Sequence, residues 1–204
     1  CLSGAAPLPV PVAEAFASTV GPAVLEGWGL TETSPVATVN PPDAIRLGTV
    51  GTAIDGVRLK IIDEAEEGLP AGAEGEVCVQ GENVMKGYWN KPAETRATFT
   101  ADGWLKTGDI GALDADGYLT IRDRKKDMII IKGLKVFSAQ VEAVIGEHPS
   151  VEESAVVGLP DELGDETIKA FVVLKKDACV GKPELLQFFR DRLDAYKRPR
   201  DLEI

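Results

Sequence analysis

The chain has 204 residues, enough for two small domains or for one domain and a large piece of another. Its 44% hydrophobic and 27% charged residues are typical of a globular protein and exclude wholesale disorder. The net charge of −11 disfavours nucleic acid as a partner, and no apolar run reaches the length of a transmembrane segment. Three dispersed cysteines and a single histidine argue against a disulfide framework and a zinc site, which favours a reducing cytoplasm.

The first forty residues alternate between helical and extended patterns. Residues 11–17 predict a short helix, and residues 23–26 predict a buried strand that runs into the turn Gly27-Trp28-Gly29. No charged-then-apolar leader precedes them, so we expect no signal peptide.

Apolar and polar residues alternate with a period of two over much of residues 48–120. Residues 57–61, 76–80 and 118–121 predict half-buried strands, and a hairpin turn is expected at residues 114–117. This region predicts a small antiparallel barrel or sandwich.

The composition changes at Arg122. Six basic and two acidic residues give the stretch 122–135 a local charge of +4, and we expect a domain boundary near residues 122–126. The stretch is interpreted either as a solvated basic loop or as a flexible positive connector over an anionic ligand. A DNA-binding loop is disfavoured because no aromatic residues are interleaved and the surroundings are acidic.

A β-α-β-β-α pattern follows. Ser138 is the expected N-cap of a helix, residues 151–159 and 167–174 predict strands, and Pro183 opens a further helix. His148, in Glu147-His148-Pro149, is expected to be structural rather than part of a catalytic triad.

The turn Gly27-Trp28-Gly29-Leu30-Thr31-Glu32 carries the first candidate site. Trp28 offers a flat face for a base, Thr31 a hydroxyl for a phosphate oxygen, and Glu32 a hard oxygen ligand for Mg²⁺. On this motif alone, a plain strand-to-loop turn with Trp28 in the core is equally favoured.

Three further candidates lie downstream. Asp109 ends the glycine-punctuated turn 102–109, and its carboxylate suits the adjacent hydroxyls of a ribose, although a self-capping turn is favoured on that motif alone. Arg124 supplies fixed donors for ribose or phosphate, and Lys132-Gly133 offers charge beside a backbone that a thin ligand can approach.

The order of these motifs is more specific than any one of them. Together they resemble the AMP-forming adenylating superfamily of acyl-CoA synthetases, luciferases and adenylation domains, and residues 123–129 look most like fatty acyl-CoA ligases. The likeness covers essentially the whole chain. The matching segments are, in order, Ser3–Leu8, Gly27–Pro35, Gly87–Pro92 with Thr95, Asp102–Asp109, Asp123–Gly133 and Tyr196–Arg200.

The resemblance implies roles for individual residues. An adenine pocket would be lined by Gly4, Ala5, Ala6, Pro7 and by Gly27, Trp28 and Gly29. Thr31 would contact the α-phosphate, Glu32 the Mg²⁺, and Asp109 the ribose hydroxyls with help from Arg124. Lys126 falls on the family's hinge, and Lys132 with Gly133 would line the passage for coenzyme A.

The implied reaction has two steps. A fatty acid and ATP give acyl-AMP and pyrophosphate, and coenzyme A then displaces AMP. The resemblance implies an α+β fold: residues 1–121 would be the C-terminal part of a large AMP-binding domain, with an α/β piece at 1–42 and a β-barrel-like subdomain at 43–121. Residues 122–204 would form a small mobile α+β domain, incomplete at its end.

Two departures from the family pattern refine this interpretation. Trp28 stands where tyrosine is more frequent, and Ile130 stands where luciferases carry a lysine, which argues against that branch. The family's phosphate loop would lie before Cys1 and its final catalytic lysine after Ile204. We therefore expect the missing N-terminal part to be a partner of this chain and the isolated chain to be inactive in adenylation.

The expected partners are a fatty acid, ATP and coenzyme A, with no nucleic acid and no transmembrane segment. The expected location is the cytoplasm, with peripheral membrane association left open. An aryl- or short-chain acyl-CoA ligase and a non-catalytic nucleotide-binding module are the alternatives.

Overall fold

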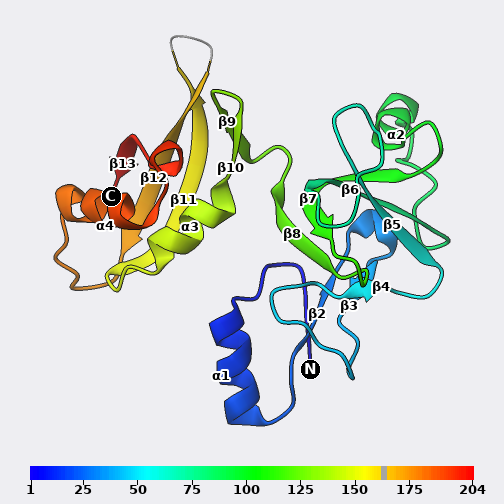
Figure 1. Ribbon diagram of the computed structural model, residues 1–204, viewed down its shortest axis with the longest axis horizontal. Helices are drawn as coiled ribbons and strands as arrows, with labels where there is room; N and C mark the ends of the chain where they lie inside the picture. The colour runs from blue at the N-terminus through cyan, green and yellow to red at the C-terminus, as the bar shows by residue number, and fades with distance from the viewer. Residues whose placement is uncertain (162–164) are drawn as a thin grey trace. The chain divides into compact units, whose positions relative to one another are not determined.

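The computed structural model describes residues 1–161 and 165–204 and divides into two compact units, Cys1–Ile121 and Arg122–Ile204 (Figure 1). None of the helices in these described residues combines the length and the apolar character that crossing a lipid bilayer requires.

The first unit opens with a small four-stranded sheet of order β1-β2-β3-β4. Strand β1 pairs in parallel with β2, whereas β2–β3 and β3–β4 are antiparallel. The helix α1 begins with a proline in its first turn and ends where Gly21 adopts a φ of 97°. The elements are β1 (Leu2–Ser3), α1 (Val10–Val20), β2 (Leu25–Trp28), the 3₁₀ turn η1 (Thr31–Thr33), β3 (Thr38–Val39) and β4 (Thr52–Ala53).

The second sheet of this unit has the order β5-β6-β7-β8. Its strands are β5 (Val57–Ile62), β6 (Gly75–Gly81), β7 (Leu105–Leu113) and β8 (Leu119–Arg124), and α2 (Pro92–Thr98) precedes β7. The expected antiparallel pairing of β5 with β6 is present, but in the described residues the sheet stays open with β5 and β8 at its edges. The predicted antiparallel architecture is therefore confirmed, whereas these described residues do not close into a barrel.

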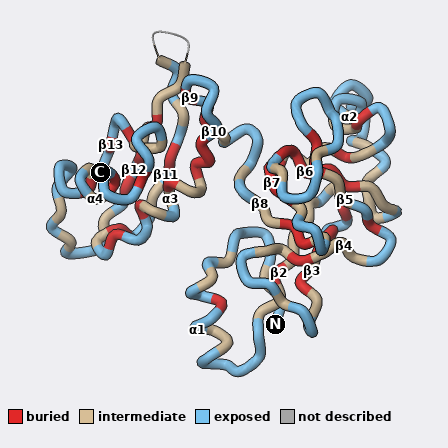
Figure 2. Tube along the Cα trace, in the orientation of Figure 1, coloured by how far each residue is buried: buried red, intermediate tan, exposed pale blue. Residues whose placement is uncertain are grey.

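The core of the first unit forms two clusters, and two partly buried residues, Trp28 and Leu59, pack against both of them. Ala37, Val57 and Val79 form the first cluster, and Ile61, Val77 and Leu119 form the second. Trp28 packs against both (Figure 2 shows the buried stretches of the chain). The end of β2 is thus fixed by apolar packing on more than one side.

The second unit begins with a β-hairpin and continues into a three-stranded sheet of order β11-β12-β13. Strands β11 and β12 are antiparallel, and β13 joins β12 in parallel. The elements are β9 (Met128–Ile131), β10 (Leu134–Phe137), α3 (Ser138–Gly146), β11 (Val151–Pro160), β12 (Glu166–Leu174), α4 (Lys182–Arg192), η2 (Ala195–Lys197) and β13 (Asp201–Glu203).

One core holds this unit together. It joins the hairpin, both helices and the sheet through buried residues that include Val141 of α3, Ile168 of β12 and Phe189 of α4. Helix α4 carries Glu184 in its first turn and two arginines in its last turn, which complements the helix dipole. The overall α+β class is confirmed.

Two local predictions were wrong in this unit. The basic stretch 122–135 is not a continuous loop, because most of it forms the end of β8 and the β9–β10 hairpin. Ser138 is the first helical residue of α3 rather than its N-cap. The capping acceptor is the Asp123 carboxylate, which accepts bonds from Ser138 Oγ at 2.9 Å and from the Ala139 amide at 3.2 Å.

Candidate functional site

The parallel pairing of β1 with β2 brings the first two motifs together. Ser3 pairs with Glu26, so Gly4 follows directly beside Gly27. A Cβ added at Gly4 would lie 3.2 Å from the Gly27 carbonyl oxygen. The buried Glu26 accepts a hydrogen bond from the Leu8 amide at 3.1 Å, which ties the far end of the Gly4–Pro7 segment to β2. Glu26 was not predicted as a site residue from the sequence. A charged residue within a short apolar strand was the signal that could have identified it.

Trp28 and Asp109 meet through a direct hydrogen bond. The indole Nε1–H donates to Asp109 Oδ2 at 2.8 Å, across 81 positions of sequence. Asp109 is buried, with only 4% of its surface exposed. Trp28 therefore packs in the core and also orients a buried carboxylate, which combines the two interpretations that its motif left open.

A bulge in β7 aims Asp109 at Trp28. The β6–β7 register shifts between Glu76 and Cys78, opposite residues 107–109. Gly108 takes a φ of 72° there, and its amide donates to Glu76 Oε1 at 3.1 Å. The sequence analysis placed Asp109 at the end of a turn, which was wrong because β7 already begins at Leu105. The bulge instead redirects one side chain within a strand.

The loop after β2 is shaped by close backbone contacts. A Cβ at Gly29 would lie 1.9 Å from the Pro35 carbonyl oxygen, so no other residue fits without movement of the loop. The buried Thr33 accepts a bond from the Leu30 amide at 2.9 Å. Asn83 Nδ2 donates to the carbonyls of Thr33 and Val36 at 2.8 and 2.9 Å. Thr33 and Asn83 were not singled out from the sequence.

Glu32 is oriented from the segment that follows β6. The Tyr88 hydroxyl donates to Glu32 Oε1 at 2.8 Å, and this bond raises the pKa of the phenol. The Met85 amide donates to the Glu32 carbonyl oxygen at 2.8 Å. Tyr88 itself is held by Thr95, whose Oγ1 accepts from the Tyr88 amide at 2.9 Å. Tyr88 lies in the motif Gly87–Pro92, but no role for it was predicted from the sequence.

Glu32 can supply only part of the coordination shell of a Mg²⁺ ion. No group of three or more His, Cys, Asp or Glu side chains able to hold a metal occurs in the described part of the chain. Mg²⁺ usually keeps several waters and binds through one or two carboxylates together with phosphate oxygens. A single oriented carboxylate such as Glu32 fits that mode of binding.

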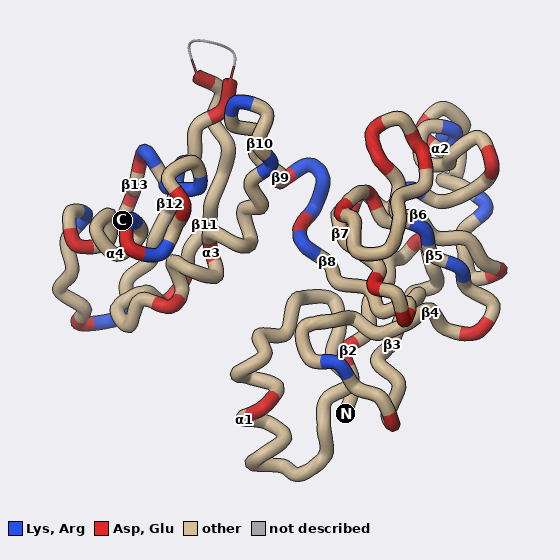
Figure 3. Tube along the Cα trace, viewed as in Figure 1, with Lys and Arg blue, Asp and Glu red and all other residues tan. Residues whose placement is uncertain are grey.

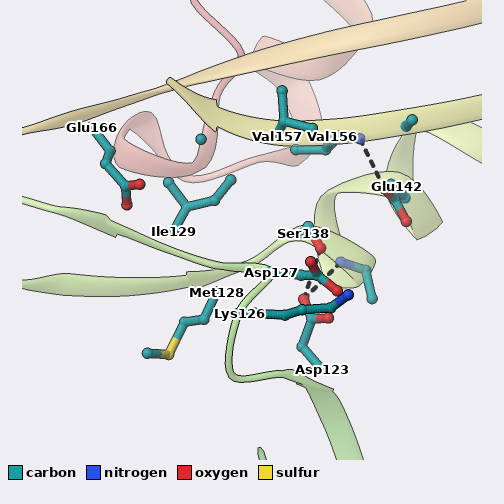
Figure 4. Close-up of a pocket in the computed structure, with 13 residues that line it drawn as sticks. Asp123, Lys126, Asp127, Met128, Ile129, Ser138, Glu142, Val156, Val157 and Glu166 are labelled. Atoms are coloured by element: carbon teal, nitrogen blue, oxygen red, sulfur yellow. Dashed lines mark hydrogen bonds between the residues drawn. The ribbon is translucent and has the colours of Figure 1, made fainter. Parts of the chain in front are cut away.

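The other predicted site residues belong to the second unit. Lys and Arg residues are concentrated along the chain from β8 into β9 (Figure 3). The turn between these strands is closed by a hydrogen bond from the Asp127 amide to the Arg124 carbonyl oxygen at 3.0 Å. Lys126 lies in this turn and lines a cavity of about 460 Å³ (Figure 4). The cavity is bounded by α3, β9, β11 and the start of β12.

Lys132 and Gly133 form the tip of the β9–β10 hairpin. Both have a positive φ, 49° for Lys132 and 79° for Gly133, and a Cβ at Gly133 would meet no atom within 4 Å. Two consecutive positive φ values define a type I′ turn. The tip therefore presents an uncovered stretch of backbone.

Other reactive residue types have structural roles. His148 is buried, accepts from the Ser150 amide at 3.2 Å and packs edge-on against Phe188, as expected of a structural histidine. Cys78 is also buried, and burial raises its thiol pKa to about 12, so it is a poor nucleophile.

Comparison with known proteins identifies the family. Residues 1–89 match the family model of AMP-binding enzymes, and residues 140–204 match the model of the AMP-binding enzyme C-terminal domain. The chain belongs to the AMP-binding enzymes.

Curated relatives of this AMP-binding chain are CoA ligases. The long-chain-fatty-acid–CoA ligase of Bacillus subtilis is 45% identical over 205 residues, covering 100% of this chain and 36% of the relative. The enzyme of the same name from Escherichia coli O6:H1 is 41% identical, covering 98% of this chain and 36% of the relative. The 4-coumarate–CoA ligase 1 of Petroselinum crispum is 39% identical, covering 97% of this chain and 38% of the relative. The chain thus spans little more than a third of these ligases.

Solved structures of AMP-binding enzymes share the fold. ATP-bound MatB from Rhodopseudomonas palustris aligns with a TM-score of 0.92 and 38% identity, covering 99% of this chain and 40% of that one. The o-succinylbenzoate CoA synthetase of Bacillus subtilis in complex with AMP aligns with a TM-score of 0.87 and 35% identity, covering 98% and 41%.

Proposed function

We propose that this chain is the C-terminal part of an ATP-dependent fatty acid–CoA ligase. The observation that carries the proposal is the hydrogen bond between Trp28 and Asp109. It joins the residue assigned to adenine with the residue assigned to ribose, and Glu32 lies four positions after Trp28, in the loop that follows β2. Identities of 41–45% to long-chain-fatty-acid–CoA ligases support the fatty acid as substrate class.

In the first half-reaction the fatty carboxylate attacks the α-phosphorus of ATP and pyrophosphate leaves. Trp28 and the Gly4–Pro7 segment hold the adenine, Asp109 accepts hydrogen bonds from the ribose hydroxyls, and Thr31 donates to an α-phosphate oxygen. Glu32 is the protein ligand of Mg²⁺, which supplies charge neutralisation when bound. Positioning and charge neutralisation account for most catalysis at phosphorus.

In the second half-reaction the thiol of coenzyme A attacks the acyl carbonyl carbon and AMP leaves. We assign Arg124 to the ribose, Lys126 to the hinge, and Lys132 with Gly133 to the passage for the thiol-bearing arm. Residues 122–204 act as a mobile domain on residues 1–121, and a hinge in a loop suits such gating. We assign the enzyme to the cytoplasm, where the thiol substrate stays reduced.

The test is carboxylate-dependent exchange of pyrophosphate into ATP by the full-length protein. We expect exchange with a fatty acid such as octanoate, followed by thioester formation when coenzyme A is added. Absence of exchange with every fatty acid, in a folded protein, would refute the proposal. The 204-residue chain alone should give negligible exchange.

An aryl-CoA ligase is the second candidate, because 4-coumarate–CoA ligases are 38–39% identical over 97% of the chain. Cinnamate and acetate, compared with octanoate in the same assay, separate aryl, short-chain and fatty acid substrates. A non-catalytic nucleotide-binding module is tested by calorimetry of the isolated chain with AMP, with Asp109→Ala as the control.

A further inference from the structure

Two neighbouring carboxylates, on Asp165 just before β12 and on Glu166 at its start, accept hydrogen bonds from backbone amides of β9 and of the hairpin tip. The Ile130 amide donates to Glu166 Oε2 at 2.5 Å. The Lys132 amide donates to both carboxylate oxygens of Asp165, at 2.9 Å to Oδ1 and 2.8 Å to Oδ2. Amides two residues apart emerge on the same edge of a strand, so the two acidic side chains cover one edge of the hairpin.

Asp165 acts on the strained residue of the hairpin tip. Lys132 has a φ of 49°, a conformation that a residue with a Cβ adopts at an energetic cost. A hydrogen bond from an amide to a carboxylate is shorter and stronger than one between neutral groups. The bonds from Lys132 to Asp165 thus favour the conformation in which Gly133 presents its backbone.

Both carboxylates are themselves held in place. The Asp165 amide donates to Asp161 Oδ1 at 2.9 Å, and the Asp161 amide donates to the Asp165 carbonyl oxygen at 2.7 Å. Glu166 reaches across from β12 toward β9, beside Ile129 (Figure 4). A Cβ at Gly158 of β11 would lie 3.0 Å from Glu166 Oε1 and from Ile129 Cγ2, so glycine leaves room for this side chain.

We infer that Asp165, supported by Glu166, is a positioning residue for the second half-reaction. It fixes the Lys132–Gly133 turn in the conformation that admits the thiol-bearing arm of coenzyme A. The inference rests on the proposed function and adds to it a residue that touches neither nucleotide nor acyl group. Because Asp165 acts through the hairpin tip, its loss should affect the coenzyme A step and leave adenylation unchanged.

The kinetic test uses Asp165→Ala, Asp165→Asn and, as a matched control, Glu152→Gln, an exposed acidic residue of β11. Each is made in the full-length protein, and pyrophosphate exchange is measured separately from thioester formation on preloaded acyl-adenylate. We expect Asp165→Ala to raise the KM for coenzyme A about fivefold to tenfold, as loss of a charge-assisted hydrogen bond implies. Asp165→Asn keeps one acceptor oxygen, so its KM for coenzyme A should lie between those of Asp165→Ala and the wild type. Glu152→Gln should have the KM of the wild type.

A second measurement does not depend on activity. Amide hydrogen exchange, followed by NMR on the 204-residue chain, should show Lys132 protected in the wild type and exposed in Asp165→Ala. Equal protection in both proteins would overturn the inference. So would an unchanged KM for coenzyme A in an active enzyme, or equal slowing of both half-reactions. A wild-type protein without pyrophosphate exchange would instead refute the proposed function, a result distinguishable from these.

Discussion

The candidate nucleotide residues of the first unit and the hairpin tip of the second are held by different means. In the first unit, the two candidate carboxylates are oriented by other side chains: Trp28 orients Asp109, and Tyr88 orients Glu32. In the second unit, side chains hold the backbone of the hairpin, because Glu166 binds the Ile130 amide and Asp165 binds the Lys132 amide. A nucleotide is recognised by directed polar groups, whereas a thin arm needs an open path, and each form of support suits its task.

The largest expected effect in this comparison is at Gly29. Gly29→Ala places a methyl group 1.9 Å from the Pro35 carbonyl oxygen, so the loop that carries Thr31 and Glu32 must move. We expect the free energy of unfolding to fall by about 3 kcal/mol, in the range of severe steric changes. Urea denaturation measures it. Gly68→Ala, where a Cβ meets no atom within 4 Å, is the control and should cost little.

The next effect is expected at Asp109. Asp109→Ala leaves the partly buried Trp28 Nε1–H without its acceptor and removes the proposed ribose ligand. We expect a loss of about 2 kcal/mol of stability and at least about tenfold weaker AMP binding. Calorimetry measures the affinity for AMP and urea denaturation measures the stability, so the two methods separate the two effects. If AMP binds the variant as tightly as the wild type, the ribose assignment is wrong.

Tyr88→Phe should have a smaller effect. It removes one partly exposed hydrogen bond to a carboxylate, worth about 1 kcal/mol. Because that bond raises the pKa of the phenol, its contribution is complete below the ordinary tyrosine pKa and disappears as pH rises through the raised pKa. The stability difference between wild type and variant, followed by denaturation across this range, should vanish at high pH. A difference independent of pH would assign the effect to packing alone.

The smallest effect is expected at the hairpin tip. Lys132→Asn removes the charge but keeps a residue that tolerates the left-handed conformation. We expect a change of less than about 0.5 kcal/mol in the free energy of unfolding, as for other exposed positions. A loss as large as that at Asp109 would show that the two regions do not differ in the way described above.

The elements that could be predicted from the sequence are those in which apolar residues recur at a helical or strand spacing over most of their length. The helix at residues 11–17 is confirmed by α1, and the strands at 57–61, 76–80, 151–159 and 167–174 are confirmed by β5, β6, β11 and β12. It missed α2, which buries no residue and so carries no periodic signal. It also missed β7, because Gly108 and Gly111 punctuate that strand and gave it the pattern of a turn.

Only the site residues that belong to recognisable sequence motifs could be predicted. Trp28, Glu32 and Asp109 were selected from their chemistry, and their assignments stay predictions. Asn83 and Asp165 were not found, since each acts on backbone atoms of a segment distant in sequence. Short polar residues in loops usually satisfy their own turn, so residue type alone does not reveal such a contact.

The bond between Trp28 and Asp109 has a practical consequence. An indole that donates to a carboxylate changes its emission when that carboxylate acquires another partner. Occupancy of the first unit by AMP should therefore alter the fluorescence of Trp28 directly, without a dye. The other two tryptophans, Trp104 and the 89% exposed Trp89, supply background emission that Trp89→Phe and Trp104→Phe would remove, so the chain carries its own optical reporter.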